Sequence, residues 1–322
     1  MASLLSVENL QVQFQTKKGI NTAVDGVSFS VEKGRILGIV GESGCGKSVT
    51  SMSILQLLGS NARISGGSIK LDGKELIGLP EKEMCRIRGN DIAMIFQYPM
   101  TALNPTLTIG TQLMEPVMLH QNCGKKEAWT RAVDVLKRVG IAAPEKRMKE
   151  YPHQLSGGMR QRVMIAMAVS CEPRLLIADE PTTALDVTIQ AQILELMCEL
   201  REKMGTAIML ITHDMGVVAE TADDVLVLYA GKAVEYGSIE DIFERPKHPY
   251  TQGLLNSIPR LDEDVELLNT IEGTVPAPDA MPAGCRFAPR CPYGKDRCMK
   301  EKPGVYHAGN SLVSCFRYEG EK

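Results

Sequence analysis

The sequence contains no long hydrophobic run and no marked excess of one charge. No apolar stretch reaches the roughly 18 residues that a membrane-spanning helix requires, and the first residues lack the charged start and apolar core of a signal peptide. The net charge of -3 gives no sign of the basic surface that is typical of nucleic-acid-binding proteins. We therefore expect a soluble, cytoplasmic protein without a nucleic-acid partner, which reaches a membrane only by docking.

Short apolar runs alternate with helical patterns along much of the chain. Residues 36–40, 175–178 and 207–211 are short buried-strand patterns. Residues 49–58 and 188–203 place apolar side chains at helical spacing after two of these strands. With 44% hydrophobic residues in 322, this alternation predicts an α/β core with a mainly parallel sheet.

Two further regions differ from this core. Residues 68–72 predict an antiparallel edge strand, and the pattern from about residue 101 to 151 is helical. After about residue 245 the chain becomes rich in proline, with nine of its 17 prolines. We expect this part to be a loop-rich extension without a large core of its own.

A glycine-rich loop, residues 41–48, joins a predicted strand to a predicted helix. Its glycines let successive backbone N–H groups converge on phosphates at the positive end of the helix. Lys47 adds a charge for the β- and γ-phosphates of ATP, and the Ser48 hydroxyl can ligate Mg²⁺. The predicted nucleotide-binding residues of this segment are Gly41, Ser43, Gly44, Cys45, Gly46, Lys47, Ser48 and Val49.

Two acidic residues follow the buried strand at residues 175–178. Asp179, at the strand end, suits a second contact to Mg²⁺. Glu180, one residue later, is placed to orient or deprotonate the water that attacks ATP.

A third motif begins at Ser156, which has the character of a helix N-cap. Gly157 and Gly158 in the first turn weaken the helix but leave its N–H groups uncrowded, so that they can bind an anion. Because this loop and Lys47 are expected on separate lobes, the motif predicts that a second subunit supplies the nucleotide.

Together these motifs resemble those of the ATP-binding subunits of ABC transporters, over roughly residues 4–250. The resemblance implies a P-loop NTPase (RecA-like) core with an antiparallel β subdomain and an inserted helical subdomain. It implies an ATP-binding domain at residues 1–244, with the helical subdomain at about 100–158, and an extension at 245–322. It also implies roles for five further residues: Gln97 as the Q-loop glutamine, Gln161 in the signature loop, Asp186 in the D-loop (residues 184–186), His213 as the γ-phosphate switch and Phe14 as the residue stacked on adenine.

Three segments are similar to the dipeptide and oligopeptide importers of this family, a branch shared with nickel importers: residues 98–105, 181–188 and 245–255. The resemblance implies an ATP-hydrolysing motor on the cytoplasmic face of the inner membrane. Its implied partners are a second ATPase, expected to be a paralogue, two permease subunits and an extracellular or periplasmic solute-binding protein. Import of nickel or another small solute, a soluble non-transport ATPase and a clamp that does not hydrolyse ATP stay open as alternatives.

Four of the nine cysteines lie in the extension, at Cys285, Cys291, Cys298 and Cys315. A disulfide is not expected in the cytoplasm, the close cysteine pair of most zinc sites is absent, and the spacing is not that of common ferredoxins. Members of the peptide-importer branch with a similar arrangement carry a [4Fe–4S] cluster there. The resemblance therefore implies such a cluster, with zinc or free thiols as alternatives, and we expect the other five cysteines to be reduced.

Overall fold

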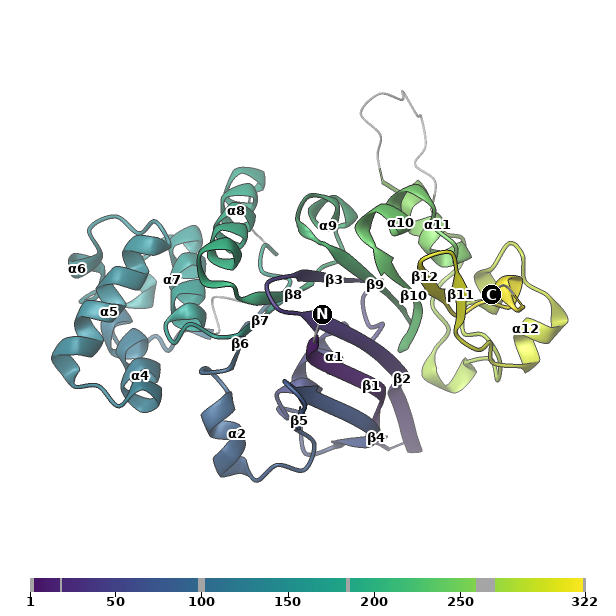
Figure 1. The fold of residues 1–322 in the computed structure, drawn as a ribbon, viewed down its shortest axis with the longest axis horizontal. Helices are drawn as coiled ribbons and strands as arrows, with labels where there is room; N and C mark the ends of the chain where they lie inside the picture. Colours follow the sequence, from purple (N-terminus) through teal and green to yellow (C-terminus); the bar gives the residue numbers. More distant parts are fainter. Residues whose placement is uncertain (1–2, 18, 98–101, 184–185, 259–269, 321–322) are drawn as a thin grey trace. The chain divides into compact units, whose positions relative to one another are not determined.

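The computed structural model describes residues 3–17, 19–97, 102–183, 186–258 and 270–320 (Figure 1). Its contacts divide the chain into two compact units. One unit comprises Glu32–Arg35 and Gly78–Ile211; it contains the two acidic residues after the strand at 175–178 and is called the carboxylate unit. The other comprises Ser3–Val31, Ile36–Ile77 and Thr212–Lys322; it contains the glycine-rich loop, or phosphate loop, at residues 41–48 and is called the phosphate-loop unit. These units do not follow the boundary at residues 244 and 245, which stays a prediction.

The carboxylate unit is built on three parallel strands in the order β6–β7–β8. These strands are β6 (Ile92–Ile95), β7 (Leu175–Asp179) and β8 (Ala207–Ile211). Every residue of β7 and β8 is buried, which explains their uninterrupted apolar pattern. The carboxyl ends of the strands are level, with Ile95 opposite Ala178 and Asp179 opposite Ile211.

Helices make up most of the rest of this unit. They are α2 (Glu81–Ile87), α4 (Ile109–Gln121), α5 (Lys125–Arg138), α6 (Pro144–Arg147), α7 (Gly157–Val169) and α8 (Val187–Met204), with a short 3₁₀ turn, η1 (Pro152–Gln154). Helices α4, α5 and α7 pack against one another, and α5 buries Ala132, Val135 and Leu136 on one face. The helical pattern after residue 101 is thereby confirmed.

The phosphate-loop unit contains an antiparallel sheet and part of a mixed one. The antiparallel sheet has the order β2–β1–β4–β5. Its strands are β1 (Ser3–Thr16), β2 (Gly19–Glu32), β4 (Ala62–Leu71) and β5 (Lys74–Glu75). The mixed part has the order β11–β12–β10–β9–β3. Its strands are β3 (Ile36–Val40), β9 (Asp224–Tyr229), β10 (Lys232–Ser238), β11 (Tyr306–Ala308) and β12 (Ser311–Val313).

The helices of this unit are short. They are α1 (Lys47–Ile54), α9 (Met215–Thr221), α10 (Ile239–Glu244), α11 (Pro249–Asn256) and α12 (Asp296–Lys300), together with the 3₁₀ turns η2 (Pro278–Ala280), η3 (Ala288–Arg290) and η4 (Phe316–Tyr318). Among the described residues, no helix combines the length and the apolar character needed to cross a membrane.

The extension joins the core of the phosphate-loop unit. Strand β12 pairs with β10, where Val313 lies opposite Glu235. Phe287 is buried and packs edge-on against the ring of Tyr229 in β9, with 5.1 Å between the ring centroids. The extension therefore gains its order from strands and rings of the unit that carries it.

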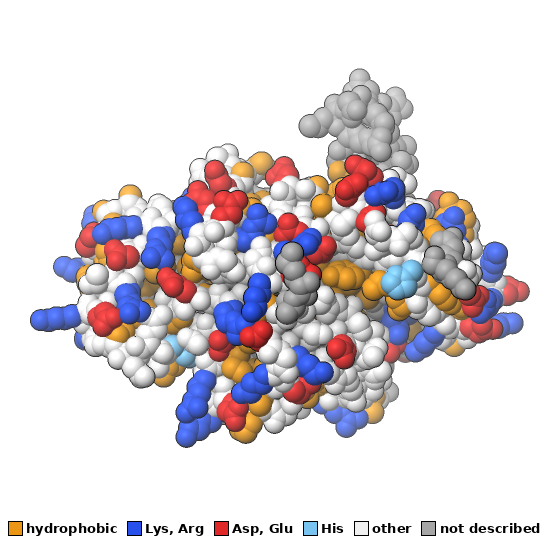
Figure 2. Space-filling view, in the orientation of Figure 1, with side chains coloured by type: hydrophobic (Ala, Val, Ile, Leu, Met, Phe, Trp, Pro, Cys, Tyr) orange, Lys and Arg blue, Asp and Glu red, His pale blue; other side chains and the backbone are white. Residues whose placement is uncertain are grey.

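On the face of the molecule shown in Figure 2, basic and acidic side chains are interspersed.

Candidate nucleotide site

The glycine-rich loop connects β3, whose residues are all buried, to α1. Gly41 has φ +150°, and a Cβ there would lie 2.1 Å from the carbonyl oxygen of Leu228. Gly44 has φ +78° with open space around it. Only glycine fits at position 41, because the loop passes directly against the end of β9 there.

Lys47 is buried, and its ammonium group folds back over the loop. Its Nζ donates hydrogen bonds to the carbonyl oxygens of Gly41 at 2.6 Å and Glu42 at 3.2 Å. It also lies 3.9 Å from the Cys45 thiol, whose pKa is raised by burial although the lysine charge opposes this. Ser43, Gly44 and Ser48 are exposed, so the loop keeps one open side beside a positive charge.

A cavity of about 1080 Å³ opens beside this loop within the phosphate-loop unit, large enough for a nucleotide. Ser43 and Gly44 line it, together with the end of β1 and the start of β2. Phe14 is not among its lining residues and lies in β1 opposite Ala62, so its contact with adenine stays a prediction.

Sequence analysis missed two parts of this lining. One is Ile20, which is 59% exposed, and the other is the extension, at residues 275–279, Met281 and Arg286. Ile20 could have been noticed as an isolated apolar residue in a polar stretch of sequence, but no local signal points to the extension.

In the carboxylate unit, Glu180 lies where three strands end together. Its Oε2 accepts hydrogen bonds from Gln97 Nε2 at 2.8 Å and from Thr183 Oγ1 at 2.9 Å. Its backbone N–H donates to the carbonyl oxygen of Ile211 at 2.8 Å, and its φ is +47°. Asp179 is buried at the end of β7. The structure thus brings the predicted Gln97 and Glu180 together. It adds Thr183, a contact not predicted from the sequence although this residue lies only three positions after Glu180.

The third motif also forms as expected at the start of α7. The Ser156 side chain caps the helix by accepting the N–H of Met159 at 3.3 Å. Ser156, Gly157 and Gly158 line a cavity that Asp186 also lines, and Asp186 itself caps α8. The D-loop residues 184 and 185, and residues 98–101 after the Q-loop, lie outside the described residues.

Gln161 and His213 occupy different environments. Gln161 is buried in α7 and its Nε2 donates to the carbonyl oxygen of Pro181. His213 is exposed after β8, and the preceding Thr212 donates its N–H to the carbonyl oxygen of Ile39 at 3.2 Å. His213 therefore lies beside the strand that leads into the phosphate loop, whereas Gln161 supports the segment after Glu180.

Comparison with known proteins identifies the family. The sequence profile described as "ABC transporter" matches residues 24–183, and that of the "Oligopeptide/dipeptide transporter, C-terminal region" matches residues 234–298. An oligopeptide transport ATP-binding protein of Bacillus subtilis, AppD, is 56% identical over 100% of this chain and 98% of its own length. The chain belongs to the ABC transporter family. The family predicted from the motifs is therefore confirmed.

Other relatives of this ABC protein have similar descriptions. The dipeptide transport ATP-binding protein DppD of Bacillus subtilis is 54% identical, covering 98% of this chain and 95% of its own, in keeping with the peptide-importer resemblance. The oligopeptide transport ATP-binding protein OppD of Escherichia coli is 51% identical, covering 98% and 93%.

Solved structures support the predicted fold class. A dimeric post-hydrolysis state of the ATP-binding cassette MJ0796 bound to ADP and Pi has a TM-score of 0.66 at 27% identity, covering 73% of this chain and 98% of that one. CbiO1 from Clostridium perfringens, part of the ABC transporter complex cbiONQ, has a TM-score of 0.65 at 28% identity, covering 76% and 92%. The α/β fold with a P-loop NTPase core is confirmed.

The prediction of a [4Fe–4S] cluster, or of zinc, in the extension is wrong. Cys285, Cys291, Cys298 and Cys315 line one cavity, yet among the described residues no group of three or more His, Cys, Asp or Glu side chains is arranged to hold a metal ion. The descriptions of the relatives name ATP-binding proteins and mention no cluster. Burial raises the pKa of Cys285 to about 11 and also raises the pKa of Cys291 and Cys315, so these side chains are thiols at neutral pH. Cys285, Cys291, Cys298 and Cys315 form no disulfide.

Proposed function

We propose that this ABC protein is the ATP-hydrolysing motor subunit of a bacterial importer for dipeptides and oligopeptides. The observation that carries this proposal is the set of hydrogen bonds around Glu180, since a clamp that does not hydrolyse ATP has no need of a positioned carboxylate. The match of residues 234–298 to the oligopeptide and dipeptide transporter extension supports the peptide cargo.

The residues around the phosphates would divide the work. The loop amides and Lys47 would bind the β- and γ-phosphates of ATP. Glu180 would accept a proton from the attacking water, Gln97 would orient the carboxylate, and His213 would contact the γ-phosphate. The Glu180 carboxylate is already held by two donors, so little reorganisation would be needed at the reaction step.

The candidate ligands for Mg²⁺ are a hydroxyl, a carboxylate and an amide, the oxygen donors that this ion prefers. Ser48, Asp179 and Gln97 would hold it together with ATP oxygens. When bound, Mg²⁺ supplies positive charge that neutralises the phosphates.

A second ATPase subunit would complete the reaction. The cavity lined by Ser156, Gly157, Gly158 and Asp186 combines uncrowded helix N–H groups with space, which suits the γ-phosphate of a nucleotide held by another chain. Gln161 would act by holding Pro181 after the catalytic strand. We propose a paralogue as that second chain.

Two permease subunits would dock on the helical part of the carboxylate unit. Exposed large apolar side chains occur there at Leu107, Met118, Leu119 and Tyr151, and the last turn of α4 carries Leu119 at 69% exposure. Such side chains are a common feature of binding surfaces. Docking would place the protein on the cytoplasmic face of the inner membrane, and an extracellular or periplasmic binding protein would deliver the peptide.

Reconstitution would test the proposal. The chain, its candidate partner ATPase and the permeases would be assembled in proteoliposomes, and ATP hydrolysis and uptake of a labelled dipeptide would be measured. We expect both to depend on MgATP and to be lost in Glu180→Gln. Uptake of nickel instead of peptide would show that the motor serves an importer for another solute. ATP turnover without co-purifying permeases would favour a soluble ATPase.

A further inference from the structure

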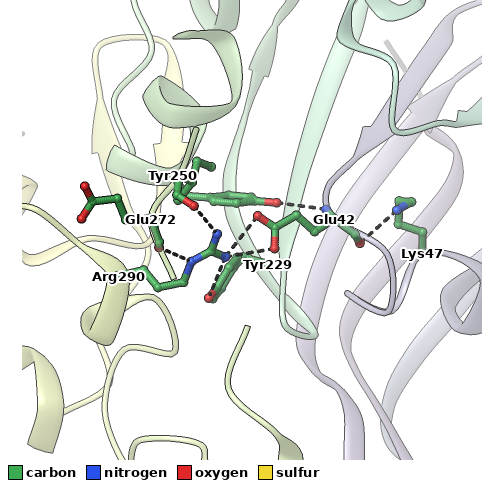
Figure 3. Close-up of polar contacts among 7 residues, drawn as sticks. Glu42, Lys47, Tyr229, Tyr250, Glu272 and Arg290 are labelled. Carbon is green, nitrogen blue, oxygen red and sulfur yellow. Dashed lines mark hydrogen bonds and ion pairs between the residues drawn. The ribbon is translucent and has the colours of Figure 1, made fainter. Parts of the chain in front are cut away.

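Arg290, at the end of η3, reaches from the extension to the phosphate loop (Figure 3). Its Nη1 donates to both carboxylate oxygens of Glu42, at 3.1 and 3.0 Å. The arginine side chain is only 5% exposed and that of Glu42 is 29% exposed, so solvent screens this ion pair weakly.

The guanidinium group is also held from the side of the extension. Its Nε donates to the carbonyl oxygen of Glu272 at 3.0 Å and its Nη2 to that of Ile271 at 3.1 Å, while Nη1 lies 3.4 Å from the Tyr229 hydroxyl. Burial would lower the pKa of Arg290, but its hydrogen bonds to Glu42 and Tyr229 raise it above the ordinary value. The arginine is thus charged and fixed in direction, and only a planar group with several donors can make all these contacts.

A second residue of the extension contacts the same point of the loop. The hydroxyl oxygen of Tyr250, in α11, accepts the backbone N–H of Glu42 at 3.0 Å (Figure 3). Tyr250 is fully buried, and its ring packs edge-on against that of Tyr229 with 4.6 Å between the centroids. Glu42 is therefore held at its side chain and at its N–H, while its carbonyl oxygen accepts a hydrogen bond from Lys47.

We propose that Arg290 is a positioning residue for nucleotide binding, which acts on the phosphate loop through Glu42. Fixing Glu42 fixes the carbonyl oxygens that hold the Lys47 ammonium group, and thus the place where this charge meets the phosphates. The guanidinium also offsets a carboxylate that would otherwise repel the triphosphate. This inference rests on the proposed ATP-binding function and adds the extension to the machinery of the loop.

Binding of a fluorescent trinitrophenyl-ATP to the full-length chain with Mg²⁺ tests the proposal. We expect Arg290→Met to weaken binding about tenfold, equivalent to about 1.4 kcal/mol. Arg290→Lys should recover only part of this loss, because lysine keeps the charge but lacks the planar set of N–H donors of the guanidinium group. Glu42→Gln breaks the ion pair but also removes the repelling carboxylate charge, so it should weaken binding less than Arg290→Met does. The double variant should be no weaker than Arg290→Met alone, since both changes break one contact.

Arg297→Met is the matched control. Arg297 is also in the extension, but it pairs with Glu301 and Glu319 and does not touch the loop. We expect unchanged nucleotide affinity in this variant. An unchanged affinity in Arg290→Met, or additive losses in the double variant, would overturn the inference.

Two further measurements separate the possible failures. If the unmodified chain does not bind the nucleotide, the proposed function fails; if it binds and Arg290→Met binds equally well, only the inference fails. Should Arg290→Met not fold, Tyr250→Phe can be tested instead, because it removes only the hydroxyl oxygen that accepts the backbone N–H of Glu42. An about threefold loss of affinity in that variant is expected, and no loss would again overturn the inference.

Discussion

The two regions to which we assign the nucleotide chemistry are held in place by different kinds of contact. Glu180 is fixed by groups at the carboxyl ends of neighbouring parallel strands, from Gln97 after β6 and Ile211 in β8. Glu42 in the phosphate loop is fixed by Tyr250 and Arg290, which lie 208 and 248 residues further along the chain.

The difference separates what a sheet provides by itself from what must be added. Parallel strands bring their carboxyl ends to one edge, so side chains that follow them meet without further support. Three of the eight residues in the glycine-rich loop have no side chain with which to fix its path. In this protein, a tyrosine and an arginine from the extension supply that support, so the loop and the extension form one structural element.

The largest effect is expected from Glu180→Gln, which isolates the chemistry of the strand-end region. The amide keeps the size of the carboxylate but cannot accept the proton of the attacking water, so kcat should fall by about 10²–10⁴. Single-turnover ATP hydrolysis and nucleotide affinity would be measured in parallel. Glu195→Gln, on the exposed face of α8, is the control that should change neither.

If Glu180→Gln lost nucleotide affinity to the same degree as turnover, the carboxylate would be a binding group. The two regions would then not divide binding from chemistry as we propose.

Two glycine substitutions test the backbone of the phosphate loop. In Gly41→Ala the new Cβ would lie 2.1 Å from the Leu228 carbonyl oxygen, so the loop and β9 must move apart, at a cost of about 3 kcal/mol in the free energy of unfolding. Gly44→Ala meets open space and costs only about 1 kcal/mol for its left-handed backbone. Denaturant unfolding curves of the two variants provide the measurement, and equal costs would show that the close approach to β9 is unimportant.

A smaller effect is expected from Thr183→Val, which sharpens the comparison within the strand-end region. The change keeps the shape of the side chain and removes one of the two hydrogen bonds to Glu180 Oε2. We expect kcat to fall about tenfold, as for the loss of one hydrogen bond to a charged group. Turnover under saturating MgATP measures this, and an unchanged rate would mean that the Thr183 hydroxyl does not position the carboxylate.

The strand-end region was predicted in part. The buried strand before Glu180 followed from the residue pattern, but Gln97 came only from the resemblance to the ABC family, and neither β6 nor the contact of Thr183 with Glu180 was predicted. The supports of Glu42 could not be predicted in this way, because Arg290 and Tyr250 lie in irregular, proline-rich chain whose path depends on packing around Tyr229 and Phe287. The cysteine cluster misled for the same reason, since spacing along a chain does not determine how buried thiols are oriented.

The last prediction concerns pH and tests the support of the loop by the extension. His248 caps α11, the helix that carries Tyr250, and its Nδ1 accepts the N–H of Tyr250 at 3.1 Å. Burial, with a further contribution from Arg317, lowers the pKa of His248 from 6.5 to about 3. Between these values the unfolded chain binds a proton that the folded chain does not, so stability should fall as pH falls below about 6.5.

The expected slope from His248 approaches about 1.4 kcal/mol per pH unit, measured by denaturant unfolding between pH 7.5 and 5. Glu235 accepts the N–H groups of Lys247 and His248, and burial raises its pKa, so its own titration acts in the opposite sense. The informative quantity is therefore the difference in the free energy of unfolding between the natural chain and His248→Asn. Asparagine keeps a side chain that can cap the helix but does not titrate. Parallel pH profiles for the two proteins would show that this cap does not couple the extension to proton binding.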